Sequence, residues 1–390
     1  MTDHNMSSRK LRLGMVGGGG GSSIGGSHRI ASRLDDRFEL VGGAFDIDPE
    51  RGRAFARSLG LPDDRIYDDY RHMAAAEKAR PDRCDLVSIA TPNSSHFEIA
   101  RAFVESGFNV LCEKPLTTNP GDAETLAEMV AERDVIFAVM YGYTGYPLVR
   151  QARAMIAGGE IGPVRVVHTE FAHGGLAGAL PPEAAAAWRL DPEIQGPSLA
   201  LGDVGTHALA LATFIVGRRV IEVSADLHCF APGRALDDNA HVMLRFDGGA
   251  RGTLWASGVA AGITHRHGIR IFGESGGLEW RQSHPNELWH FPAGGRPQVI
   301  ERDARGLYPV STRRSRIGAG HPGGYFEAWA NIYADVADAV AARAAGERVD
   351  PLALQFPTVQ DGLHGVKFVE AAVLSSRQNG RWVAVDPPAR

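Results

Sequence analysis

The sequence is poor in cysteine, and the little that it has is scattered. Its 390 residues include 3 cysteines, Cys84, Cys112 and Cys229. They form no CxxC pair and lie in apolar, strand-like surroundings. We therefore expect buried thiols in a reducing compartment, without disulfides. No ligand spacing indicates a zinc or other metal site, so no metal is expected.

Long apolar runs and an excess of one charge are also missing. Nowhere do roughly 18 apolar residues follow one another, and the opening MTDHNMSSRK has no apolar stretch typical of a secretion signal. A cytoplasmic protein with no membrane partner is expected. The formal net charge is −5, whereas proteins that bind nucleic acid usually carry an excess of basic residues. Nucleic acid is therefore not an expected partner.

The length of the chain and its first part predict a two-domain α/β protein. A chain of 390 residues exceeds the size at which one hydrophobic core usually stops growing. Near its start, short apolar runs alternate with helical patterns, as in a doubly wound parallel sheet of the Rossmann type. We expect strands at 11–16, 38–45, 85–90, 109–114 and 135–140, and helices at 25–34, 49–59, 70–79, 95–106 and 122–133.

After about Tyr146 the pattern changes to strands at hairpin spacing with glycine-rich turns. This change predicts a dinucleotide-binding domain over 1–146. It also predicts an α+β domain over 147–390, built on a mostly antiparallel open sheet and used for substrate binding and oligomerisation. Strands are expected at 164–173, 220–230, 240–249, 250–259, 267–281, 286–291 and 298–302, and helices at 201–217 and 324–346.

A glycine-rich loop, MVGGGGGSSIGGSHRIA (15–31), joins the first expected strand to the first expected helix. In that context glycines let the backbone approach a pyrophosphate closely, and the helix N-terminus presents free N–H groups to the anion. Five residues, instead of the usual two, separate Gly19 from Gly25, so the close helix–strand contact falls at either Gly25 or Gly26. The plainer alternative is a tight turn without a ligand.

Asp46 ends the second expected strand, where an acidic side chain in this fold reaches the ribose hydroxyls of the adenosine. A carboxylate there repels a 2′-phosphate and favours NAD over NADP. Arg51 lies near enough in sequence to weaken that preference. Alternatively, Asp46 serves only the turn before the helix that starts at Pro49.

Polar residues also follow the third and fourth expected strands, in ATPNSSH (90–96) and CEKPL (112–116). Open α/β sheets bind ligands at these carboxyl ends. Because Lys114 precedes a proline, its backbone is pushed toward an extended conformation, and its side chain projects into the same crevice. The alternatives are a helix cap at Ser94 or Ser95 and a merely solvated lysine.

GDVGTH places Asp203 and His207 four residues apart, so on a helix they share one face. A histidine beside a carboxylate can be held in one tautomer and serve as a general base. The alternative is a helix cap at Asp203 and a packed histidine at 207.

Together these motifs, in this order and spacing, resemble the Gfo/Idh/MocA oxidoreductases over nearly the whole chain. The resemblance rests on ATPNSSH, CEKPL and LGDVGTHALALATF. It implies oxidation of a secondary ring hydroxyl of a sugar, glycoside or cyclitol by hydride transfer to NAD. A homodimer or homotetramer is implied as well. There are two departures from the usual family pattern: the five-glycine loop is longer, and QGPSLALGD stands where a glycine cluster is frequent.

The resemblance also implies a role for each matching residue. Lys114 would contact the reacting hydroxyl and the nicotinamide ribose, His207 would be the general base, and Asp203 would bind and polarise the substrate. The cofactor would contact Gly17, Gly19, Gly25, Asp46, Thr91, Pro92, Asn93, His96, Glu113 and Lys114. The substrate would contact Lys114, Tyr143, Tyr146, Trp188, Arg189, Asp203, His207 and His321.

Two other functions stay open at this point. Some proteins of this fold oxidise a sugar transiently, eliminate its aglycone and reduce the sugar again, which would make the chain an NAD-dependent glycosidase or lyase. A non-catalytic dinucleotide-binding sensor is the third reading, and the presence of Lys114, Asp203 and His207 argues against it.

Overall fold

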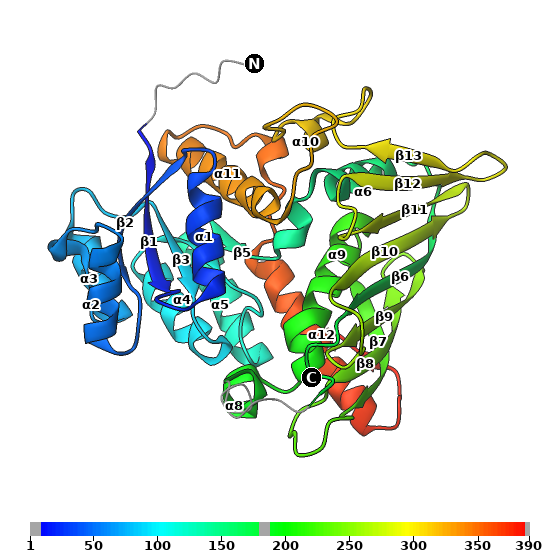
Figure 1. Cartoon of the computed structure of the whole chain (residues 1–390), viewed down its shortest axis with the longest axis horizontal. Helices are drawn as coiled ribbons and strands as arrows, with labels where there is room; N and C mark the ends of the chain where they lie inside the picture. The colour runs from blue at the N-terminus through cyan, green and yellow to red at the C-terminus, as the bar shows by residue number, and fades with distance from the viewer. Residues whose placement is uncertain (1–8, 179–187, 387–390) are drawn as a thin grey trace.

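The first five strands of the chain form one parallel sheet. In the computed structural model, which describes residues 9–178 and 188–386, they lie in the order β2-β1-β3-β4-β5 (Figure 1). Neighbouring strands are parallel throughout. The strands are β1 (Leu11–Gly17), β2 (Phe38–Ala44), β3 (Leu86–Ala90), β4 (Asn109–Cys112) and β5 (Phe137–Val139). The predicted Rossmann sheet is thus confirmed.

Helices connect these strands, and each of them except α4 begins with a side-chain cap. They are α1 (Ser23–Arg33), α2 (Pro49–Ser58), α3 (Tyr70–Ala79), α4 (His96–Glu105) and α5 (Pro120–Arg133). Asp48 accepts hydrogen bonds from two backbone N–H groups in the first turn of α2. Asn119 caps α5 in the same way through one N–H group. A proline at the first position of both helices loses no hydrogen bond there.

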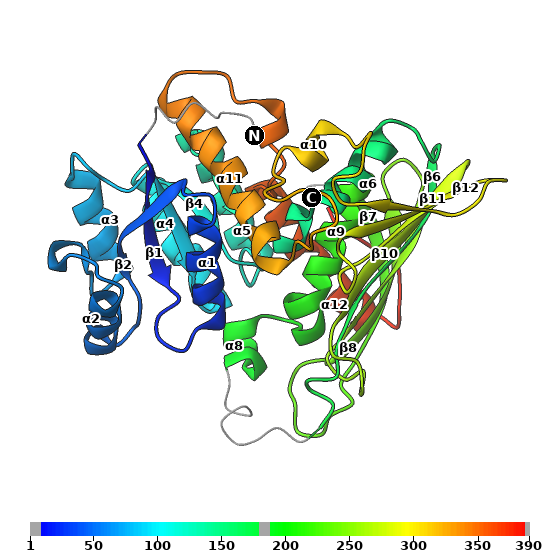
Figure 2. The same ribbon diagram turned by 45° about the horizontal axis from the view of Figure 1, so that its top comes forward.

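A helix from the far end of the chain covers one face of this sheet. In α11 (Tyr325–Ala344), Ile332 and Val336 belong to the same buried cluster as Leu13 and Leu86. α1 lies beside α11 on that face, while α3, α4 and α5 cover the opposite face (Figures 1 and 2). The division after residue 146 remains a prediction, and α11 returns across it to complete the core of the first sheet.

The second sheet has nine strands in the order β13-β12-β11-β10-β6-β9-β8-β7-β14. All neighbours are antiparallel except β6 and β9. The strands are β6 (Val164–Ala172), β7 (Val220–His228), β8 (Asn239–Phe246), β9 (Arg251–Ser257), β10 (Arg266–Gly273), β11 (Gly276–Arg281), β12 (Glu287–Pro292), β13 (Gln298–Glu301) and β14 (Val383–Ala384). The mostly antiparallel sheet is confirmed.

Three helices pack on one face of the second sheet, namely α6 (Pro147–Ala157), α9 (Thr206–Val216) and α12 (Val359–Arg377). The sequence pattern predicts only α9 among them. α12 also reaches the core of the first sheet through Val359 and Val366, so it is buried on several sides and lacks a clear polar face. None of the helices in the described part of the chain has the length and apolar character needed to cross a bilayer.

Candidate functional site

The glycine-rich loop packs too closely for side chains at several positions, among them Gly17, Gly19 and Gly25. At Gly17 the backbone φ is +74°, and an added Cβ would lie 2.6 Å from the carbonyl oxygen of Ala90 in β3. At Gly25 an added Cβ would lie 2.2 Å from the carbonyl oxygen of Gly18. At Gly26 its nearest neighbour would be 4.0 Å away, so Gly25 makes the close helix contact that the sequence left open between them.

This loop sits where the connections of the sheet change direction. β1 has β2 on one side and β3 on the other, and such a switch point opens a crevice at the carboxyl ends of the strands. Ser22 caps α1 by accepting a hydrogen bond from the N–H of Gly25 at 3.1 Å. The glycine cradle and the start of α1 together fit a dinucleotide pyrophosphate.

Asp46 follows β2 at the same edge and carries a charged partner. Its Oδ1 accepts hydrogen bonds from an Arg51 terminal nitrogen and from the Asp48 backbone N–H, both at 2.9 Å. Arg51 chiefly, and then the backbone N–H of Asp48, hold the pKa of Asp46 below its ordinary value. An ionised carboxylate therefore stands where ribose hydroxyls would bind, with a cation beside it.

Residues after β3 divide between the crevice and the protein interior. Thr91 lies against Gly17, and Pro92 is exposed. Asn93 is buried and donates hydrogen bonds to the backbone and side-chain oxygens of Gln195, at 3.1 and 3.2 Å. Gln195 ends α8 (Pro192–Gln195), so Asn93 joins the first sheet to the second part of the chain.

His96 is fully buried and connects two loops of the cofactor edge. Its ring nitrogens face the carbonyl oxygens of Pro115 and Thr91, at 2.8 and 2.9 Å. Burial lowers the pKa of His96. Because both ring nitrogens lie against backbone carbonyl oxygens, His96 positions Thr91 and the Lys114–Pro115 turn.

The central contact of the site joins the two parts of the chain. Lys114 follows β4, and its Nζ lies 3.2 Å from Oδ1 of Asp203 and 2.5 Å from the backbone oxygen of Asp203. Burial opposes ionisation of Asp203, but Lys114 and then Arg189 outweigh it and hold the pKa of Asp203 below its ordinary value. An ammonium and a carboxylate thus form an ion pair in the crevice.

The helix expected over 201–217 is not continuous. It begins as a π-helical turn at Leu201–Gly205 and continues as α9 from Thr206. Such widened turns are frequent at functional sites. Here the turn carries Asp203, whose backbone oxygen is the one that Lys114 contacts. The 3.6-residue period of the sequence does not distinguish this π-helical turn from an α-helix, so the continuous helix expected over 201–217 was wrong.

His207 stands at the start of α9, one turn after Asp203. Its Nδ1 is buried and has no hydrogen-bond partner in the described structure. Burial first, and then the nearby Lys114, His267 and His265, lower the pKa of His207 well below its ordinary value. A neutral imidazole beside a lysine is the form that a general base needs.

Aromatic rings and further histidines surround His207. The Tyr143 ring meets the His207 ring edge-on with centroids 4.9 Å apart, and the Tyr143 hydroxyl lies 3.2 Å from Nε2 of His265. His267 is buried, and its ring stacks on Phe171 with centroids 4.6 Å apart. Phe171, His265 and His267 were not predicted from the sequence. The only available signal was the spacing of two between the histidines, which places both on one strand face.

The remaining predicted substrate residues lie at different distances from this group. Arg189 acts on Asp203 electrostatically, and its guanidinium lies 4.7 Å from the Trp188 ring centroid. Tyr146 lies one layer behind Tyr143 and packs on Trp280. His321 is exposed, and in the described structure its only side-chain hydrogen bond is to Gly318, at 3.3 Å. The structure therefore does not bring His321 to the Lys114–Asp203 pair.

Glu113 lies behind Lys114 in the buried wall of the site. Its Oε2 accepts a hydrogen bond from the Lys114 backbone N–H at 3.1 Å, and its Oε1 lies 3.0 Å from Nε2 of His28. No group of three or more His, Cys, Asp or Glu side chains within 9–178 and 188–386 is arranged to hold a metal ion.

Comparison with known proteins matches both parts of the chain to family descriptions. Residues 11–141 match "Oxidoreductase family, NAD-binding Rossmann fold", and residues 149–279 match "GFO/IDH/MocA C-terminal domain".

Three relatives illustrate the match. The uncharacterised oxidoreductase YfiI of Bacillus subtilis (strain 168) is 40% identical over 381 residues, which cover 96% of this chain and 97% of that protein. An inositol dehydrogenase homologue of Azotobacter vinelandii, crystallised with NAD+, superposes with a TM-score of 0.91 at 44% identity, covering 97% and 98% of the two chains. Levoglucosan dehydrogenase of Pseudarthrobacter phenanthrenivorans is 28% identical, with 81% and 82% covered.

Proposed function

Because this chain belongs to the Gfo/Idh/MocA oxidoreductase family and carries its NAD-binding Rossmann domain, we propose that it oxidises a secondary ring hydroxyl of a sugar, glycoside or cyclitol. The observation that carries the proposal is the contact of Lys114 with Asp203 beside the neutral His207. The Azotobacter vinelandii homologue, also crystallised with NADH and myo-inositol, and levoglucosan dehydrogenase support this substrate class.

Each residue of the site has a task in this reaction. NAD, when bound, supplies the carbon that accepts the hydride. His207 takes the proton of the substrate hydroxyl, and the ammonium of Lys114 stabilises the negative charge that grows on that oxygen. Asp203 holds Lys114 in place and accepts a hydrogen bond from a neighbouring hydroxyl. The glycine loop and Asp46 fix the cofactor so that the ring carbon and the acceptor meet.

Polar side chains around the central pair would receive the other hydroxyls. Tyr143 lies against His207 and contacts His265, and Arg189 and His173 lie near enough to Asp203 to act on it electrostatically. Hydroxyl-rich rings suit such a set, because each group can donate a hydrogen bond to an oxygen at neutral pH.

A substrate panel tests the proposal and separates it from its alternatives. Purified protein is incubated with NAD and a set of cyclitols, free sugars and glycosides, while NADH absorbance and product release are followed together. A dehydrogenase accumulates NADH in step with substrate loss. Release of an aglycone without net NADH would instead identify a redox-neutral glycosidase or lyase. Absence of any hydride exchange across the panel would favour a sensor.

Replacing Asp46 is expected to shift the cofactor preference. In Asp46→Ser the carboxylate that repels a 2′-phosphate is gone. Arg51 then loses its nearer partner, keeps the more distant Asp48 at 3.8 Å, and becomes available to that phosphate. We expect the ratio of kcat/KM for NADP over NAD to rise by at least about tenfold, or about 1.4 kcal/mol. The measurement compares both cofactors at fixed substrate and ionic strength. Asp63→Ser, which removes an exposed partner of Arg57, is the control, and an unchanged ratio in Asp46→Ser would contradict the assignment.

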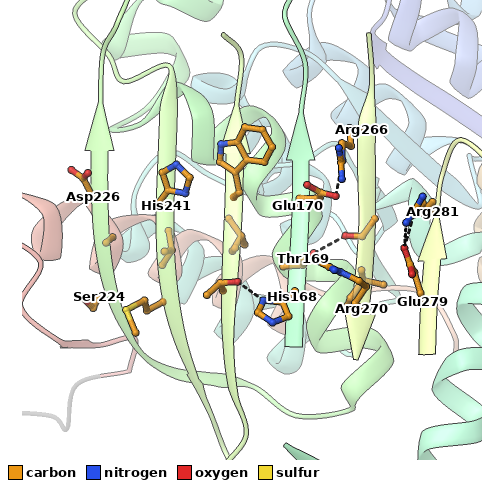
Figure 3. Close-up of a pocket in the computed structure, with 18 of the residues that line it drawn as sticks. His168, Thr169, Glu170, Ser224, Asp226, His241, Arg266, Arg270, Glu279 and Arg281 are labelled. Atoms are coloured by element: carbon orange, nitrogen blue, oxygen red, sulfur yellow. Dashed lines mark hydrogen bonds and ion pairs between the residues drawn. The ribbon is translucent and has the colours of Figure 1, made fainter. Parts of the chain in front are cut away.

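The uncovered face of the second sheet is the surface through which we propose that two copies associate. A pocket of about 490 Å³ lies on this face, and neither Lys114 nor His207 lines it. Figure 3 shows ion pairs such as Arg266–Glu170 along it. Met243 is 54% exposed there, and His241 stacks on Trp255. Mixed charges and exposed apolar groups are complementary to a second copy of the same face related by a two-fold axis.

Solution mass tests this association. Light scattering after size exclusion is expected to give a dimer or tetramer for the natural chain, and a smaller species for Met243→Glu, because the new carboxylate would be buried at the interface. Leu354→Glu, at an exposed leucine outside this face, is the matched control. A monomeric natural chain would rule out the interface.

A further inference from the structure

We propose that His28 is a positioning residue that acts through Glu113 to hold Lys114 toward Asp203. The inference rests on the proposed function, since it concerns the lysine that would stabilise charge on the substrate oxygen. His28 lies in α1, behind the glycine loop, and its side chain is 1% exposed. It therefore acts from the interior and never meets the substrate.

Glu113 is the link between this histidine and the lysine. One carboxylate oxygen lies 3.0 Å from His28 Nε2, and the other accepts the hydrogen bond of the Lys114 backbone N–H at 3.1 Å. The Glu113 side chain is 8% exposed. A buried carboxylate needs a donor at each oxygen, because an unpaired buried charge is costly. With both donors in place, Glu113 fixes the backbone from which the Lys114 side chain extends.

The other nitrogen of His28 is held as firmly. Nδ1 lies 2.7 Å from the Tyr333 hydroxyl and 3.3 Å from Ser88 Oγ, and the Tyr333 and Ser88 oxygens are 3.1 Å apart. In a consistent proton arrangement, Nδ1 accepts a hydrogen bond from one of these two hydroxyls and Nε2–H donates to Glu113. Each group then donates one hydrogen bond and the chain ends on the carboxylate, which fixes the tautomer of His28.

These groups come from four separate segments of the chain. α1 supplies His28, β3 supplies Ser88, the end of β4 supplies Glu113, and α11 supplies Tyr333. Trp329, also from α11, packs edge-on against His28 with centroids 4.9 Å apart. Through Glu113, the helix that begins at the glycine loop is thereby hydrogen-bonded to the backbone of Lys114. The distance between the cofactor cradle and the lysine is therefore fixed.

Three substitutions at one position test this role. Gln places an amide nitrogen near the position of His Nε2, whereas Asn places one near Nδ1. His28→Gln is thus expected to keep the bond to Glu113, while His28→Asn and His28→Leu lose it. We expect kcat to fall by about tenfold or more in His28→Asn and His28→Leu, with the KM for NAD within about threefold of the natural chain. His28→Gln is expected to keep kcat within about threefold.

A second measurement does not depend on turnover. The rate at which an amine-reactive acylating reagent labels Lys114, followed by peptide mass spectrometry, reports how firmly that side chain is held. It is expected to rise by about fivefold in His28→Asn and His28→Leu and to stay unchanged in His28→Gln. The exposed Lys78 serves as the internal reference in every sample. If no substrate of the panel is oxidised, the proposed function fails while this labelling still decides the inference.

Two results would overturn the inference. One is unchanged Lys114 labelling in both His28→Asn and His28→Leu. The other is a fall in kcat in His28→Gln as large as that in His28→Asn. The packing of the imidazole, and not its hydrogen bond to Glu113, would then explain the effect. Should His28→Leu fail to fold, the comparison of the two amides carries the test, because both fill the same buried position with a polar side chain.

Discussion

Lys114→Met is expected to lower turnover by about 100- to 1,000-fold while leaving NAD binding largely intact. The substitution keeps most of the side-chain volume and removes the ammonium that would stand beside the developing alkoxide. Loss of one such electrostatic group typically lowers kcat by about 100- to 1,000-fold, or about 2.7 to 4 kcal/mol. The glycine loop and Asp46 lie on other strands, so the cofactor cradle stays complete.

Single-turnover rates measure the loss of hydride transfer, and NADH fluorescence titration measures cofactor binding separately. Lys78→Met, at an exposed lysine of α3, is the matched control and should behave as the natural chain does. The same substitution removes Lys114, the strongest of the cationic influences on Asp203, so the pKa of Asp203 should rise. Rates near those of the natural chain in Lys114→Met would remove the lysine from the mechanism.

His207→Asn is expected to lower kcat for oxidation by about 100- to 10,000-fold, the usual contribution of a positioned base. Asparagine retains a polar group at the site but cannot take the proton of the hydroxyl. The effect should appear in kcat and much less in the affinity for NAD, because His207 lies in the second part of the chain, away from the glycine loop.

The pH dependence of this residue has a definite sign. Burial, followed by Lys114, His267 and His265, lowers the pKa of His207 well below its ordinary value of 6.5. Its base form therefore persists below pH 6.5, and activity should fall only at a lower pH, where the imidazole gains a proton. In Lys114→Met the ammonium near His207 is gone, so the acidic limb of the residual activity should move to higher pH.

Profiles of kcat/KM against pH, taken for the natural chain and for His207→Asn, check this expectation. The natural chain should show the acidic limb and the variant should lack it. His284→Asn, at an exposed histidine of the β11–β12 turn, is the control. An identical acidic limb in His207→Asn would assign the titration to another group.

The residues of the site that the sequence predicts are those that lie in short motifs or directly after an apolar strand. Lys114 and Thr91 follow apolar strands, and the carboxyl ends of parallel strands meet at one edge whatever the rest of the fold. Asp203 and His207 belong to a motif with its own spacing. Their convergence with Lys114 depends on how two domains pack, and the family resemblance, not the spacing, supplied that expectation.

The residues that were missed owe their place to contacts distant in sequence. His28 lies in a recognised helix, yet its partners Glu113 and Tyr333 stand 85 and 305 residues away. The π-turn that carries Asp203 has no periodic signal of its own. α12 is buried on several sides, which removes the polar stripe by which a helix is usually found.

The position of α11 bears on how the polypeptide acquires its shape during synthesis. The strands of the nucleotide-binding lobe leave the ribosome early, but the layer that seals one side of them is among the last segments made. Until translation passes residue 344, Leu13 and Leu86 have nothing from α11 to pack against. A fragment ending at residue 146 would contain all five strands of the first sheet. It would nevertheless expose an apolar surface and aggregate.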